Sequence, residues 1–95
     1  MALARVVSFE RINPENVERI KRNMEAGDIP EGMPPAEFLF LHDNTADTAV
    51  AIVIVDSEDD YRRADEILGS VPADEAAGRR TSAAKYEVAV RASTA

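Results

Sequence analysis

The segment 49-AVAIVIV-55 decides the fold, because it is the longest apolar run in the chain and most of its residues are β-branched. Such residues favour extended backbone, and the run is apolar on both faces, so we expect a strand that is covered on both sides. The polar stretch 43-DNTADT-48 before it predicts a hairpin turn from an earlier strand. The stretch 57-SEDD-60 after it predicts the capped, acidic start of a helix.

Toward the N-terminus, two further strands and a helix are predicted. Residues 3–10 and 37–43 alternate side chains as strands do. Between them, Asn13-Pro14 opens a helix, since asparagine caps free N–H groups and proline fits the first helical position. This helix ends near Gly27, and a loop rich in proline and glycine follows it.

Toward the C-terminus, the helix that begins at Ser57 carries an apolar stripe and ends at Gly69. Residues 73–82 are predicted to form an irregular loop. Residues 85–91 are predicted to form the last strand, with Tyr86 facing the interior.

The order of these elements predicts the fold class. Strand, helix, strand, strand, helix, strand is the order of an α+β, ferredoxin-like βαββαβ fold, with a four-stranded antiparallel sheet and two helices on one face. Residues 1–95 suffice for a single small domain. The second sheet face would expose roughly eight to ten apolar side chains, more than a monomer usually tolerates. We therefore expect a homodimer in which two sheets cover each other; the alternative is that long loops cover this face.

Composition and charge exclude several classes of function. The chain has 11 lysines and arginines against 18 acidic residues and a net charge of −7, which disfavours nucleic acid and anionic membranes as partners. An RNA-binding module with this strand order would also need stacking aromatic residues, which segment 49–55 lacks. No cysteine is present, and no apolar run approaches the length of a signal peptide or membrane span. We therefore expect a cytoplasmic protein.

Several stretches of the chain carry a resemblance to a known family. They are 4-ARVVSFE-10, 13-NPE-15, 38-FLFLHD-43, 57-SEDDYRRADE-66 and 78-GRRTSAAKYEVAVR-91. With them, nearly the whole chain resembles small actinobacterial proteins of the dimeric α/β-barrel superfamily, which includes antibiotic-biosynthesis monooxygenases. The resemblance implies a dimer in which two ferredoxin-like sheets face each other, with a pocket between the sheet and the helices of each subunit.

The superfamily that the chain resembles includes cofactor-independent oxygenases of polycyclic phenols, haem-degrading monooxygenases and muconolactone-isomerase-like enzymes. The chain departs from them because it has no tryptophan, whereas several of the oxygenases rely on one in the pocket. The haem-degrading members share an Asn–Trp–His trio, but the chain has no tryptophan and its single histidine falls on a predicted strand. These departures argue against haem degradation and weaken phenol oxygenation, and no cofactor is predicted.

Three residues are candidates for catalysis: His42, Tyr86 and Arg80. His42 can act as a base, because imidazole titrates near neutral pH, and it shares a strand face with Phe38 and Phe40, which would form a pocket wall. The alternative is a strand-end histidine that is hydrogen-bonded near the turn. Tyr86 can donate a hydrogen bond to a ligand, or it can pack in the core with its hydroxyl at the rim.

Arg80 and its neighbour Arg79 can bind a carboxylate or phosphate through their planar guanidinium groups. The alternative is an ion pair with the partner chain or with the nearby acids of residues 74–75. His42 together with Asp43 and Asp47 offers metal ligands, but they lie on a turn without a second histidine, so we expect no metal site.

These features predict a homodimer that binds a small apolar or aromatic molecule and has no identifiable catalytic set. The alternative is a cofactor-independent monooxygenase or isomerase that acts on a small aromatic or lactone substrate. A third possibility is a regulatory domain that binds a partner through a sheet edge.

Overall fold

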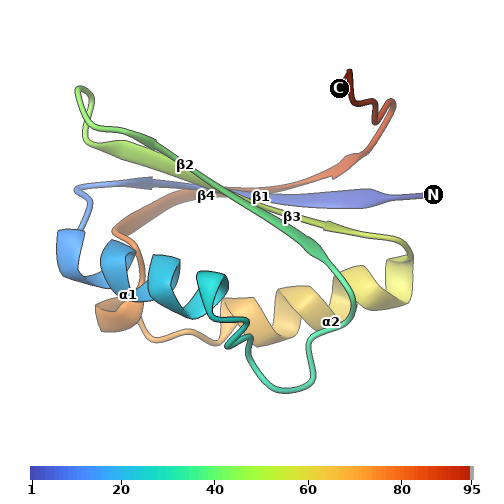
Figure 1. Ribbon diagram of the computed structural model, residues 1–95, viewed down its shortest axis with the longest axis horizontal. Helices are drawn as coiled ribbons and strands as arrows, with labels where there is room; N and C mark the ends of the chain where they lie inside the picture. The colour runs from blue at the N-terminus through green and yellow to red at the C-terminus, as the bar shows by residue number, and fades with distance from the viewer. Residues whose placement is uncertain (95) are drawn as a thin grey trace.

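The computed structural model describes residues 1–94 as one four-stranded antiparallel sheet with two helices on the same face (Figure 1). The strands lie in the order β2-β3-β1-β4, and each neighbouring pair is antiparallel. The predicted α+β, ferredoxin-like arrangement is therefore confirmed. Along the chain the elements are β1 (Leu3–Glu10), α1 (Pro14–Glu25), β2 (Glu37–Asp43), β3 (Thr48–Val55), α2 (Glu58–Gly69), the 3₁₀ turn η1 (Ala73–Glu75) and β4 (Arg79–Glu87).

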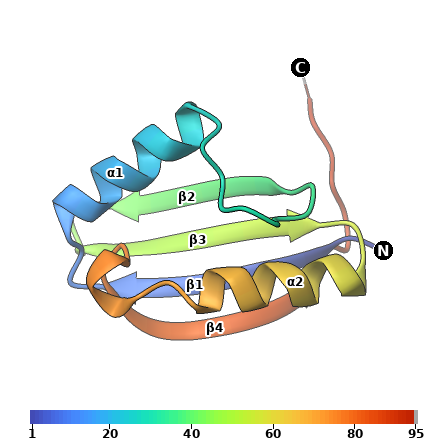
Figure 2. The ribbon, with the colours of Figure 1, turned by 90° about the horizontal axis from the view of Figure 1, so that it is seen from below.

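The two helices cover different halves of the sheet. Helix α1 lies toward β2, whereas α2 lies over β1 and β4 (Figure 2). The buried core is centred under α2, where Leu3, Val53, Val55 and Ala64 pack together. Within residues 1–94, neither helix has the length and apolar character that a membrane-spanning helix requires.

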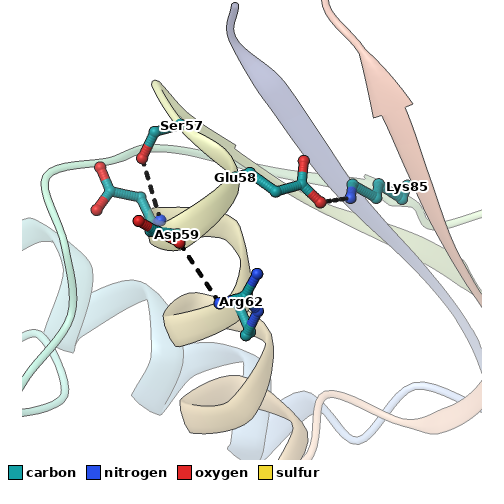
Figure 3. Close-up of polar contacts among 6 residues, drawn as sticks. Ser57, Glu58, Asp59, Arg62 and Lys85 are labelled. Atoms are coloured by element: carbon teal, nitrogen blue, oxygen red, sulfur yellow. Dashed lines mark hydrogen bonds and ion pairs between the residues drawn. The ribbon is translucent and has the colours of Figure 1, made fainter.

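Both predicted helix starts are confirmed by their caps. The Asn13 side chain accepts a hydrogen bond from the backbone N–H of Asn16 at 3.1 Å. Ser57 Oγ accepts one from the backbone N–H of Asp60 at 3.2 Å (Figure 3). After α1, Gly27 adopts a φ of +75°, which glycine takes without the steric cost of a Cβ, and the chain reverses there.

Strand register determines which side chains face the helices. Arg5 of β1 pairs with Val53 of β3 and Lys85 of β4, and its side chain contacts Asp65 of α2, so this row lies on the helix face. The opposite face is called the open face below. It carries Ala4, Val6, Leu39, Leu41, Val50, Ile52, Ile54 and Tyr86. The predicted apolar character of this second face is therefore confirmed.

Strand β4 is where the sequence-based prediction was wrong. It begins at Arg79 rather than residue 85, and it pairs with the whole of β1, from Leu3 opposite Glu87 to Glu10 opposite Arg79. The length of β1 sets its extent, because each residue of β1 offers a backbone partner. Tyr86 lies on the open face and is 57% exposed, so it does not face the core between sheet and helices.

A β-bulge interrupts the pairing of β1 with β4. Ser8 pairs with Ser82 but Phe9 pairs with Arg80, so Thr81 has no partner in the register. A bulge inserts one residue and changes the alternation of faces beyond it. As a result, Arg80 lies opposite Phe9 on the helix face, where regular pairing would have placed Thr81.

Candidate ligand-binding site

A cavity of about 1130 Å³ lies between the two helices and the sheet. All four strands, both helices, and residues 28–31, 71 and 73–78 contribute to its walls. The walls are largely apolar, with Val7, Ile20, Met24 and Val53 among the residues that line them. All three phenylalanines of the chain, Phe9, Phe38 and Phe40, also line it. Phe38 and Phe40, the predicted wall of a pocket beside His42, thus line this cavity, whereas His42 does not.

Hydrogen bonds from α1 hold one wall of this cavity in place. Each of the four successive backbone carbonyls of residues 74–77 accepts a bond from α1 or its cap residue. The donors are Asn16 Nδ2 to Asp74 at 2.9 Å and to Ala76 at 2.8 Å, Arg19 Nη2 to Glu75 at 2.7 Å, and the backbone N–H of Asn13 to Ala77 at 2.8 Å. Asn16, which is only 8% exposed, therefore joins α1 to residues 74–77 in addition to lying in the first turn of that helix.

Arg5 lies in the cavity wall between apolar neighbours. It stands between Leu3 and Val7 on the helix face of β1 and is only 5% exposed. Its Nε donates to Asp65 Oδ1 at 2.9 Å. Its Nη2 is buried and has no hydrogen-bond partner among the described residues. Since a buried donor without an acceptor is costly, this guanidinium is only partly satisfied by the protein.

Helix α2 balances the positive charges of the helix face. Arg5 and Lys85 lie side by side across β1 and β4, and like charges in such pairs repel. Asp65 and Glu58, on the same side of α2, pair with Arg5 and Lys85 respectively; the second pair is drawn in Figure 3. Each positive charge on this part of the sheet therefore meets an acid from α2.

Tyr61 lies between these two ion pairs on α2. Its ring centroid is 4.8 Å from Lys85 Nζ, a distance typical of a cation–π contact. Burial raises the pKa of Tyr61 above its ordinary value, and the nearby Asp65 carboxylate raises it further. The phenol therefore stays neutral at physiological pH.

The three predicted catalytic residues are not brought together. His42 is exposed at the end of β2, opposite Ala49, and does not line the cavity. Tyr86 lies on the open face, away from the cavity. Arg80 does line the cavity, and it lies in strand β4 rather than in the predicted loop. Their catalytic roles stay predictions.

The other sequence-based candidates are placed as follows. Arg79 forms an ion pair with Glu10 at 3.2 Å, rather than with the acids of residues 74–75. Asp43 Oδ1 accepts backbone hydrogen bonds within its own turn, and Asp47 Oδ1 accepts one from Ile12. In the part of the chain that the structure describes, no three metal-ligating side chains are grouped so as to hold an ion.

Arg5 and Asn16 were missed as site residues by reasoning from sequence. The alternation of β1 does place Arg5 in an otherwise apolar row with Leu3 and Val7, and a charge in such a row was the available signal. Asn16 carried no such signal, because its partners lie 58 and 60 residues away in sequence.

Comparisons with known proteins add no family assignment. No protein-family model matches the chain, and no match was found among curated proteins or solved structures.

Proposed function

We propose that the chain binds a small molecule with an apolar or aromatic body in the cavity between the helices and the sheet. The observation that carries this proposal is the cavity itself, at about 1130 Å³. Small-molecule sites are typically about 300–1,000 Å³, mostly apolar, and fitted with a few polar groups. This cavity has such walls and combines them with Arg5 and Asn16.

The distribution of aromatic residues supports an aromatic ligand. The chain has three phenylalanines, and all of them line this one cavity; Phe38 also packs against the core under α2. Phe38 and Phe40 lie on β2 and Phe9 on β1, so they approach the cavity from two strands. Aromatic rings bind one another in stacked or edge-to-face arrangements, and a planar ligand fits such a surface.

The proposal is tested with the neutral fluorescent probe N-phenyl-1-naphthylamine. We expect its emission to rise when it binds the wild-type protein and to stay low with Ala51→Phe, because Ala51 lies in the cavity wall and a phenyl group there occupies the space. Ala46→Phe is the matched control, since Ala46 lies in the exposed β2–β3 turn. Equal probe binding by Ala51→Phe and the wild type, or no binding at all, would contradict the proposal.

We also propose that two copies pair through their open faces, as in the dimeric α/β-barrel superfamily that the sequence resembles. Leu39, Leu41 and Tyr86 on this face are 46, 52 and 57% exposed. The chain exposes 6550 Å² in total, whereas a 10.4 kDa monomer is expected to expose about 5,400 Å². The excess of about 1,150 Å² is larger than the roughly 800 Å² that one partner buries in a standard interface.

The dimensions of the sheet are adequate for such a pairing. Four strands about 4.8 Å apart and eight residues long, at about 3.4 Å per residue, span roughly 500 Å² per copy before side-chain relief is counted. Two faces together then reach about 1,000 Å², the smallest area expected of a biological interface. The C-terminal segment leaves the sheet on this side (Figure 1) and is tethered by an ion pair between Arg91 and Glu37 at 3.0 Å.

Sedimentation at micromolar concentration tests the pairing. We expect the wild type to have twice the 10.4 kDa mass of one chain, and Ile52→Glu to have the mass of one chain, since it places a charge in the middle of the open face. Ala26→Glu adds the same charge at the exposed end of α1 and should leave the mass unchanged. A wild-type mass of 10.4 kDa would refute this proposal and leave the cavity proposal standing.

A further inference from the structure

We infer that the ligand of this cavity carries a carboxylate, which binds the guanidinium of Arg5 while its apolar body lies against the phenylalanines. This inference rests on the proposed function, because it requires a ligand in the cavity. Its starting point is the partly satisfied Arg5 side chain, which is 5% exposed and has a buried Nη2 without a partner in residues 1–94.

Arg5 cannot complete its hydrogen bonds through the contacts that surround it. Asp65 meets the Nε side of the guanidinium at 2.9 Å, and its own side chain is 56% exposed, so water screens much of its charge. The neighbouring strand positions hold Val53 and the equally positive Lys85. The guanidinium of Arg5 therefore keeps hydrogen-bonding capacity that these contacts do not use, and Arg5 lines the cavity, so a ligand there is the available source of an acceptor.

The charge of the cavity wall also favours an anion. The whole chain has 11 basic and 18 acidic residues, yet five arginines and only four acidic residues line the cavity. Three of these arginines have contacts of their own: Arg5 pairs with Asp65, Arg79 pairs with Glu10, and Arg19 donates to a backbone carbonyl. The wall is thus enriched in positive charge within an acidic protein, and that enrichment favours anions over cations.

A carboxylate matches this site better than a larger or more highly charged anion. Its two oxygens fit the planar fork of a guanidinium, and its single negative charge costs less to desolvate than a phosphate dianion beside Asp65. The ligand class is therefore a monocarboxylic acid with an aromatic or similarly bulky apolar body. Its apolar part would lie along Phe9, Phe38 and Phe40.

Titration calorimetry at pH 7 with 2-naphthoate and its neutral isostere 2-naphthamide tests the inference. We expect the wild type to bind 2-naphthoate at least about tenfold more tightly, the size typical of a hydrogen bond to a charged group. Arg5→Met should abolish this preference, and Arg5→Lys should retain part of it. Arg80→Met removes the same charge from another part of the cavity wall and shows whether that arginine binds the carboxylate instead. Arg63→Met is the matched control, because it removes the same charge from the exposed side of α2, outside the cavity; it should change the preference less than about threefold.

The neutral probe N-phenyl-1-naphthylamine separates this inference from the proposed function. If the wild type binds the probe but binds the carboxylate and the amide equally, the inference is overturned and the cavity proposal stands. A preference that persists in Arg5→Met, or that is lost in Arg80→Met instead, also overturns it. If the probe does not bind at all, both fail together. Should Arg5→Met not fold, the comparison of 2-naphthoate with 2-naphthamide on the wild type and on Arg5→Lys still tests the inference.

Discussion

Replacing Asn16 with alanine would remove two of the four hydrogen bonds that hold residues 74–77 against α1. The Nδ2 group of Asn16 donates to the backbone carbonyls of Asp74 at 2.9 Å and Ala76 at 2.8 Å, and Asn16 is 8% exposed. At about 1 kcal/mol net for each bond, the loss is about 2 kcal/mol, and the better helix propensity of alanine returns about 0.5 kcal/mol. We therefore expect a net destabilisation of roughly 1.5 kcal/mol.

Urea unfolding followed by far-UV circular dichroism at 25 °C measures this change. All variants are compared at one protein concentration, because pairing of chains would make stability concentration-dependent. Asn23→Ala is the matched control: it lies on the same helix but is exposed, so its free energy of unfolding should change by less than about 0.5 kcal/mol. If Asn16→Ala proves as stable as Asn23→Ala, the hydrogen bonds from Asn16 do not hold this wall.

Two further predictions concern the backbone and the pH dependence. In Gly78→Ala, the new Cβ would lie 2.6 Å from the Glu10 carbonyl oxygen, so we expect the free energy of unfolding in urea to fall by about 1–3 kcal/mol. In the control Gly69→Ala the new Cβ meets open space, so this change should be neutral or stabilising. Equal stabilities of the two variants would contradict the prediction. For Tyr61, the folded pKa is raised, so its contribution to stability is fully present below the unfolded value of 10.0 and is lost as pH rises through the folded pKa. Between about pH 9 and about pH 12, the free energy of unfolding should therefore fall less for Tyr61→Phe than for the wild type. Parallel curves would show that Tyr61 does not cause the fall in stability.

Much of the fold could be predicted from sequence because its signals are local. The cap residues Asn13 and Ser57 mark both helix starts, and the alternating pattern of 37–43 marks β2 with its observed bounds. These features depend on the chemistry of a few adjacent residues. They hold whatever the rest of the chain does.

Strand β4 and the site could not be predicted in this way, because both depend on distant partners. The small residues 82–84 carry little pattern, and the pairing with β1 alone makes them part of a strand. Whereas the row that contains Arg5 could be identified from alternation, its partner Asp65 lies 60 residues away on α2. The cavity likewise depends on the spacing of the two helices, which no local pattern encodes.

The unpaired Thr81 has a consequence for how this protein can change over generations. Ser82 and Arg80 already pair with two consecutive residues of β1, Ser8 and Phe9. In-frame loss of the Thr81 codon would therefore leave every other side chain of β4 on its present face of the sheet. Deletions elsewhere in the strand would reverse the side chains on one side of the break. The gene therefore has one codon in β4 at which a length mutation spares the chemistry of the cavity wall.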